Sequence, residues 1–248
     1  MQNSDRYYNA FMVQGAKFSL NDIPMCPTTA INLPKNLISY PNAKILCERL
    51  RKSRGAEFFV DAFVHFYTYA HKYDDIITGI WSEPHRAVEV LRHFAGIITP
   101  DFPTYVDFPF PLKIYNIYRM RAFGFWYGTH IGGAVINNVC WGTDETFFYT
   151  FDGIERDSMI AIETVASGLC DSYSRKRFEV GFRKMLEMLS PKTVIVYGSD
   201  DYPWFDEARK HIRLINFRRE DSLTADNYLR RSTIAYRVAR RESTDAPR

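Results

Sequence analysis

Short apolar runs alternate with longer segments of helical period along this chain, and this alternation limits its fold more than any other feature of the sequence. The clearest example lies near the C-terminus. Apolar side chains recur at helical spacing in residues 174–189, at Phe178, Phe182, Met185 and Leu189, and a Ser-Pro pair then ends the pattern. The segment TVIVYGS follows and begins with an unbroken apolar run, which is typical of a strand buried on both faces. A helix followed by such a strand predicts a parallel α/β sheet.

The same pattern, followed along the whole chain, predicts about seven strands that are nearly all joined by helices. The expected strands are 37–40 (LISY), 56–62 (AEFFVDA), 96–101 (GIITPD), 134–141 (AVINNVCW), 158–165 (SMIAIETV), 193–199 (TVIVYGS) and 213–217 (RLINF). Right-handed crossovers arrange such units into a barrel or an open doubly wound sheet. No GxGxxG follows the first strand and no Walker loop occurs, which disfavours the nucleotide-binding open sheets. We therefore expect a parallel (β/α) barrel-like fold of the TIM type, complete, incomplete or decorated, with the open sheet as the alternative.

Composition sets the domain organisation and the compartment that we expect. The chain has 248 residues, of which 46% are apolar, and it contains no repeat and no linker-like segment. We expect a single α/β domain over 1–248, with an N-terminal arm (about 1–36) and a basic helical C-terminal extension (about 219–248). Without a signal-like or membrane-spanning apolar run, and with four cysteines at no metal-binding spacing, the chain is predicted to be cytoplasmic, with no membrane partner.

Candidate site residues are those at the carboxyl ends of the expected strands, where active sites form in both α/β architectures. Asp61 and Asp101 end successive expected strands, so their carboxylates could meet. Carboxylates in a partly dry cleft resolve their repulsion by a raised pKa, a bound divalent cation or pairing with arginine. We predict both aspartates as acid/base residues or as ligands of a divalent cation such as Mg²⁺. The competing interpretation is that each carboxylate only caps a helix or a turn.

Further residues are expected to bind the substrate at the same edge of the sheet. They are Asn116, Arg119, Asn137, Trp141, Glu163 and Ser199. Ser199 follows a glycine in VYGS, but DDYP comes next and a plain tight turn is the stronger interpretation. The histidines His65 and His71, near Asp74 and Asp75, match no common metal-binding spacing, so no metal site is predicted at these histidines.

The basic charge of the protein is concentrated at its C-terminal end. The whole chain carries a net +3, whereas residues 209–248 contain eleven Lys/Arg and five Asp/Glu, a net of +6. In a helix, Arg230, Arg237 and Arg241 would share nearly one face. Such a face could bind nucleic-acid phosphates, and the alternative is a solvated surface that packs its apolar side on the barrel.

Four segments in order resemble a known family. They are FFVDAF, GIITPDFPTYVDFPFPLKIYNIYRMRAFGFWYG, VINNVCWGTDETFFYTFDGIERDSMIAIETVASG and FEVGFRKMLEMLSPKTVIVYGS. Together they are similar to the bacterial and phage family catalogued as domain of unknown function 4417, over about residues 37–217. The resemblance implies a phage or mobile-element context and brings no activity. Cys140 and Glu163 depart from the residues common in the family, which ranks Glu163 below Asp61 and Asp101.

Two hypotheses of function follow. The first is a barrel hydrolase or lyase that acts through strand-end carboxylates on a small polar ligand, phosphorylated or nucleotide-derived. The second is a non-enzymatic accessory protein that binds nucleic acid or a protein partner through its basic tail.

Overall fold

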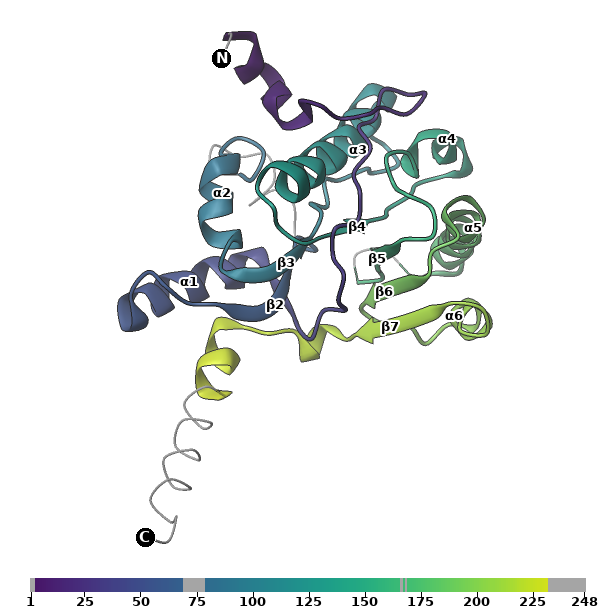
Figure 1. Ribbon diagram of the computed structural model, residues 1–248. Helices are drawn as coiled ribbons and strands as arrows, with labels where there is room; N and C mark the ends of the chain where they lie inside the picture. The colour runs from purple at the N-terminus through teal and green to yellow at the C-terminus, as the bar shows by residue number, and fades with distance from the viewer. Residues whose placement is uncertain (1–2, 69–78, 166, 168, 232–248) are drawn as a thin grey trace, which may run out of the picture.

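Seven parallel strands form one sheet in the computed structural model, which describes residues 3–68, 79–165, 167 and 169–231 (Figure 1). They are β1 (Leu37–Ser39), β2 (Val60–His65), β3 (Phe94–Ile98), β4 (Val135–Asn138), β5 (Met159–Glu163), β6 (Thr193–Tyr197) and β7 (Arg213–Phe217). Each strand pairs with the next one in the chain, so the spatial order is the sequence order. The sheet curls into a half-barrel whose edges are β1 and β7, which confirms the predicted barrel-like fold in its incomplete form (Figure 1).

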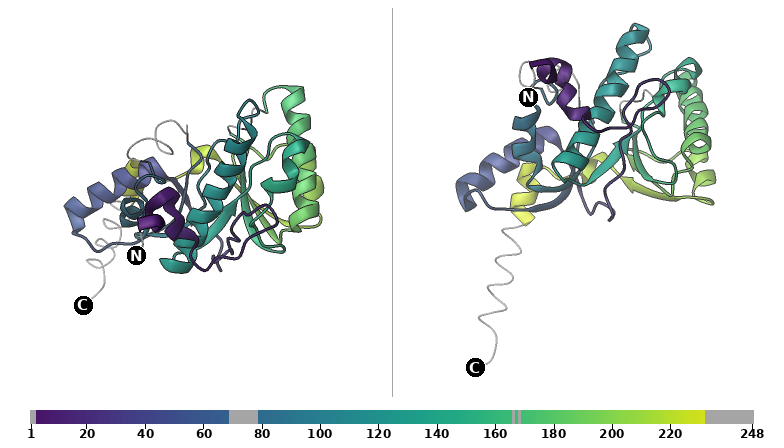
Figure 2. Two further views of the ribbon diagram at one scale, coloured as in Figure 1. Left: turned by 90° about the horizontal axis from the view of Figure 1, so that it is seen from above. Right: turned by 45° about the horizontal axis from the view of Figure 1, so that its top comes forward.

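Helices follow the strands along the outer side of this curled sheet (Figure 2). They are α1 (Tyr40–Arg54), α2 (Pro84–Leu91), α3 (Phe110–Phe125), α4 (Phe147–Thr150), α5 (Ser172–Leu189) and α6 (Pro203–Ala208). The other helical segments are the 3₁₀ helices η1 (Asn3–Val13), η4 (Asp144–Thr146) and η5 (Arg219–Asp221), and the π-helical turn η3 (Trp126–His130). Helices on one side of consecutive parallel strands are what right-handed crossovers produce when a sheet curls into a barrel.

The apolar residues of each strand divide between the two faces of the sheet. In β6, Val194 and Val196 pack with the α5 side chains Phe182 and Met185 on the outer face. Ile195 between them faces the concave side, in a cluster to which every strand contributes, with members such as Ile98 and Ile136. This two-residue alternation explains why the strand sequence is apolar throughout.

The segments that precede β1 and follow β7 lie against the sheet. The segment after η1 crosses the sheet, where Ala30 N–H donates to Val135 O (3.1 Å) and the Thr28 hydroxyl donates to Met159 O (3.2 Å) (Figure 1). After β7, the chain returns to the other edge of the sheet. There Leu223 N–H donates to Leu37 O at 2.8 Å and forms an isolated parallel bridge with Ile38.

The position of β2 corrects one expectation. The predicted strand 56–62 lies instead at Val60–His65, so Asp61 stands near the amino end of its strand and not at the carboxyl end. The apolar run continues beyond Asp61, and residues 62–66 are all buried. Asp61 is exposed to solvent within β2. The strand can therefore continue past this polar residue.

Candidate functional site at the carboxyl edge of the sheet

Polar and aromatic side chains replace the apolar core at the carboxyl edge of the concave face. We call this group the mouth cluster, and its members are His65, Tyr67, Asp101, Asn138, Glu163 and Tyr197. Glu163 and Tyr197 are register partners on β5 and β6. Asp101 lies three residues after β3 ends, and Tyr67 two residues after β2 ends. The cluster therefore occupies the edge where active sites form in parallel barrels.

Asn138 connects two members of the mouth cluster. Its side chain is fully buried, accepts a hydrogen bond from the Tyr67 hydroxyl (3.0 Å) and donates one to the Asp101 carboxylate (2.8 Å). Its backbone is held as well, since its N–H donates to the Thr99 hydroxyl (2.8 Å) and its carbonyl accepts from Arg121 (2.9 Å). With both ends of the amide used, Asn138 fixes the positions of Tyr67 and Asp101 relative to β4.

The ionisation of Asp101 is strongly perturbed. Burial raises the pKa of its carboxyl from the ordinary value of 3.8 to about 7; the negative charge of Glu163 adds to this, and the hydrogen bond from Asn138 opposes it. The residue keeps partial contact with solvent. Glu163 accepts a hydrogen bond from the Ser167 hydroxyl at 3.0 Å. The mouth cluster therefore combines one carboxyl that is protonated near neutral pH with a second carboxylate close enough to influence it.

Burial keeps two aromatic members of the mouth cluster, His65 and Tyr67, uncharged at neutral pH. Burial, and then the charges of Asp101 and Glu163, raise the pKa of Tyr67 well above its usual range. The His65 ring lies 4.4 Å from the Tyr197 ring, and its Nδ1 accepts the Tyr67 N–H at 3.3 Å. Burial lowers the pKa of His65 to about 3, so this imidazole stays neutral at physiological pH.

Asp61, the other predicted catalytic residue, is not part of this cluster. Its carboxylate lies 2.7 Å from Lys35 Nζ, and the two side chains are 49% and 76% exposed. Asp61 shares the face of β2 that carries Phe63 and His65, but it stands at the amino end of the strand. The expectation that Asp61 and Asp101 meet at one edge of the sheet was therefore wrong, because the strand begins where it was expected to end.

Two predicted substrate-binding residues instead support the loop that carries Asp101. Asn116 and Arg119 are buried on α3, where Arg119 donates to the Asn116 side chain and Asn116 donates to Pro103 O. The Arg119 guanidinium also lies 4.0 Å from the ring centre of Phe102. Both residues thus hold the segment immediately after Asp101 against α3.

The remaining predicted substrate-binding residues serve packing or turn roles in the described structure. Asn137 is buried and donates to Cys26 O (2.8 Å), in the segment that precedes β1. Trp141 packs on α5 so closely that a Cβ at Gly181 would lie 2.1 Å from its ring. The Ser199 hydroxyl bonds the Asp201 carboxylate (3.0 Å) in an exposed turn. Of the predicted set, Asp101 and Glu163 are the two that come together.

Tyr67 was not singled out from the sequence, and Asn138 and Tyr197, although expected at the ends of strands, were not chosen as substrate-binding residues. Asn138 was obscured by its neighbour, because adjacent residues of a strand face opposite sides and the sequence pattern did not assign the faces of Asn137 and Asn138. Tyr67 was placed outside any strand end because β2 was expected to finish three residues earlier. The spacing Phe63, His65, Tyr67, with every second residue on one face, was the available signal.

The structure describes some of the residues considered for metal binding and part of the basic tail. Within the described ranges, no three His, Cys, Asp or Glu side chains gather closely enough to hold a metal ion. His71, Asp74 and Asp75 lie outside the described residues. Residues 225–231 are helical and Arg230 is exposed on this segment, whereas Arg237 and Arg241 also lie outside the described residues. Nucleic-acid binding by this tail stays a prediction.

Comparison with known proteins places the chain in a family. A model described as Domain of unknown function (DUF4417) matches residues 17–218. The chain belongs to this family. The DUF4417 match includes all seven strands and the whole mouth cluster.

Two relatives of this DUF4417 protein come from phages. It is 29% identical to the Gene 1 protein of Mycobacterium phage L5 over 136 residues, which are 54% of this chain and 56% of the relative. It is also 29% identical to the Gene 1 protein of Mycobacterium phage D29 over 182 residues, 73% of this chain and 61% of the relative. The matches span less than two thirds of either relative. Because both relatives are phage proteins, they confirm the predicted phage context. No solved structure matches the chain.

The sequence predicted no membrane-spanning segment, and the helices that the structure describes can be compared with this expectation. None of these helices has both the length and the apolar character that a membrane span requires.

Proposed function

We propose that the mouth cluster is the acid–base site of a hydrolase or lyase that acts on a polar substrate, phosphorylated or nucleotide-derived. The observation that carries this proposal is the raised pKa of Asp101, about 7, with a second carboxylate beside it. A carboxyl that is protonated near neutral pH can give its proton to a leaving group, and efficiency is greatest when the pKa lies near the working pH. In this proposal Asp101 is the general acid.

Glu163 is the second functional group of the proposed site. A pair of carboxyl groups in different environments can divide the acid and base roles between them. Glu163 would accept a proton from water or from the substrate while Asp101 donates one. The hydrogen bond from Ser167 holds Glu163 Oε1 in place, and Asn138 holds Asp101.

The neutral side chains of the mouth cluster would orient the substrate. Tyr67 and Tyr197 offer hydroxyl groups and ring faces, and their ring centres lie 5.3 Å apart. The rings of His65 and Tyr197 are also in contact. Aromatic faces bordered by hydroxyls suit a sugar or a nucleobase, which agrees with a nucleotide-derived substrate.

A substrate panel with matched variants tests this function. The full chain is assayed from pH 5 to 8 on 4-nitrophenyl phosphates, 4-nitrophenyl glycosides and nucleosides, beside Asp101→Asn, Glu163→Gln and the control Asp107→Asn. Asp107 is exposed in the same loop as Asp101. We expect turnover to fall by about 100-fold or more in the first two variants and to stay unchanged in the control. Absence of turnover on the whole panel, or full activity of both variants, would contradict the proposal.

A further inference from the structure

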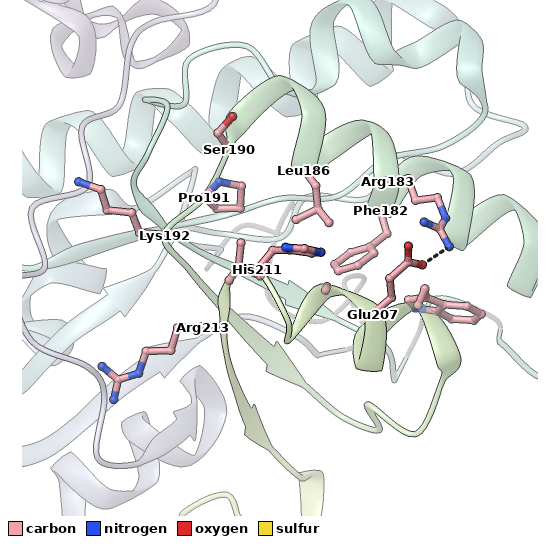
Figure 3. A pocket seen from close by; sticks show the side chains of 12 residues that line it. Phe182, Arg183, Leu186, Ser190, Pro191, Lys192, Glu207, His211 and Arg213 are labelled. Atoms are coloured by element: carbon pink, nitrogen blue, oxygen red, sulfur yellow. Dashed lines mark hydrogen bonds and ion pairs between the residues drawn. The ribbon is translucent and has the colours of Figure 1, made fainter.

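A groove lies between α5 and α6 on the outer side of the half-barrel, away from the mouth cluster (Figure 3). Its volume is about 630 Å³, within the range of pockets that hold small organic ligands. Apolar side chains from both helices and from the segment before β7 line it, among them Phe182, Leu186, Ala208 and Ile212. The groove can therefore bind the apolar part of a small organic ligand.

Cationic side chains stand around this apolar lining. Figure 3 shows Arg183 and Glu207 at one end, joined by an ion pair of 2.7 Å, and Lys192 and Arg213 at the other. Arg183 also pairs with Glu179 at 3.1 Å, so its charge is compensated. Lys192 and Arg213 are exposed, and in the described part of the chain neither has an ion-pair partner. The end formed by Lys192 and Arg213 is thus an uncompensated positive region beside an apolar groove.

Trp204, another residue that lines the groove, carries an unsatisfied donor. Its side chain is 7% exposed, and its indole N–H has no hydrogen-bond partner among the described residues. The indole also stacks on Tyr202, with ring centres 4.6 Å apart. A buried donor without an acceptor costs free energy, so the packing of Trp204 at this groove is not fully satisfied in the described structure.

We propose that this groove binds a small amphiphilic anion, in which an acidic group is attached to an aromatic or aliphatic body. The body packs on Phe182, Leu186 and Ile212, and the acidic group is attracted by Lys192 and Arg213. Because the groove lies on the outer face of the sheet and the mouth cluster on the inner face, this site is independent of the proposed catalytic function.

A matched pair of fluorescent probes tests the charge requirement. 8-Anilinonaphthalene-1-sulfonate carries a sulfonate, and N-phenyl-1-naphthylamine has the same aromatic body without it. On the folded full chain at low salt, we expect saturable binding of the anion, about tenfold tighter than that of the neutral probe. Equal affinity for the two probes, or no binding of the anion up to about 1 mM, would overturn the proposal.

Variants and spectra assign the binding to this groove. Lys192→Gln combined with Arg213→Gln should weaken the anion about fivefold or more and leave the neutral probe nearly unchanged. The matched control is Lys52→Gln with Arg54→Gln, which removes the same charge from the exposed end of α1. In methyl NMR spectra the signals of Leu186 and Ile212 should shift. Equal weakening by the control pair, or shifts at Ile98 and Ile136 of the inner face instead, would contradict the proposal.

Discussion

Asp61 and Asp101 are the same residue type beside neighbouring strands of one sheet, yet Asp61 stands near the amino end of β2 and Asp101 lies just beyond the carboxyl end of β3. Asp61 is half exposed and pairs with Lys35 in solvent. Asp101 is partly buried beside Glu163, and the pKa of its carboxyl rises to about 7. The difference shows that the position along the strand decides whether a carboxylate is an ordinary surface charge or a group that titrates near neutral pH.

The physical basis of the difference is solvation. An exposed ion pair is screened by water and contributes little. A carboxylate moved away from water and toward a like charge loses solvation and gains repulsion, and both effects favour its protonated form.

Asp101→Asn should stabilise the protein at high pH. Between about pH 4 and 7 the folded protein binds more protons than the unfolded chain, so the penalty of the Asp101 charge grows as the pH rises and is complete above pH 7. The amide keeps an acceptor for Asn138 and carries no charge. Urea unfolding at pH 8 should show a gain of about 2–4 kcal/mol, at pH 5 less than half of that gain, and near pH 3.5 almost none. A gain of equal size at pH 8 and pH 5 would show that the charge of Asp101 is not the cause of the gain.

Asn138→Ala should destabilise the protein by about 1–3 kcal/mol, because it leaves the Tyr67 hydroxyl without its acceptor and Asp101 without its donor. It should also raise the pKa of Asp101 further, since the lost hydrogen bond favours the charged form. Urea unfolding and a ¹³C titration of Asp101 measure the two effects. A lowered pKa in this variant would contradict the role assigned to Asn138.

Glu163→Gln should lower the pKa of Asp101 and still leave it above its ordinary value, because burial is the larger cause of the shift. At pH 8 the variant should gain about 1 kcal/mol of unfolding free energy, less than Asp101→Asn gains. The same ¹³C titration measures the shift. An unchanged Asp101 midpoint would mean that the two carboxyl groups do not interact.

Asp61→Asn should have the smallest effect. The lost partner is an exposed lysine, so we expect the melting temperature to change by less than about 2 °C at pH 7. The pKa of Lys35 should fall, because the hydrogen bond and charge of Asp61 raise it. Scanning calorimetry with and without added salt measures the first effect. A large salt-dependent loss would show that Asp61 is more than a surface charge.

The sequence predicted the architecture because strand and helix signals are local. The apolar run at Thr193–Tyr197 and the helical spacing of Phe178, Phe182 and Met185 both appear in the structure where they were expected. Crossover handedness allowed either a barrel or an open doubly wound sheet, and the absence of nucleotide-binding motifs favoured the barrel, whose consecutive strand order the structure shows.

The site was predicted in part, because it depends on features that a local pattern does not fix. A displacement of β2 by a few residues moved Asp61 from one end of the sheet to the other. The choice between Asn137 and Asn138 depends on a register of one residue. Glu163 was ranked below the aspartates because it departs from the family pattern, yet in the structure it is the carboxylate that acts on Asp101. Asp101 lies three residues beyond the carboxyl end of β3, close to where the strand 96–101 was expected to end.

The titration of the Asp101 carboxyl, followed by ¹³C NMR and assigned by comparison with Asp101→Asn, shows whether this carboxyl can serve as a general acid. We expect a midpoint near pH 7. A midpoint near 3.8, the ordinary value of an aspartate, would contradict the claim that the mouth cluster holds a general acid.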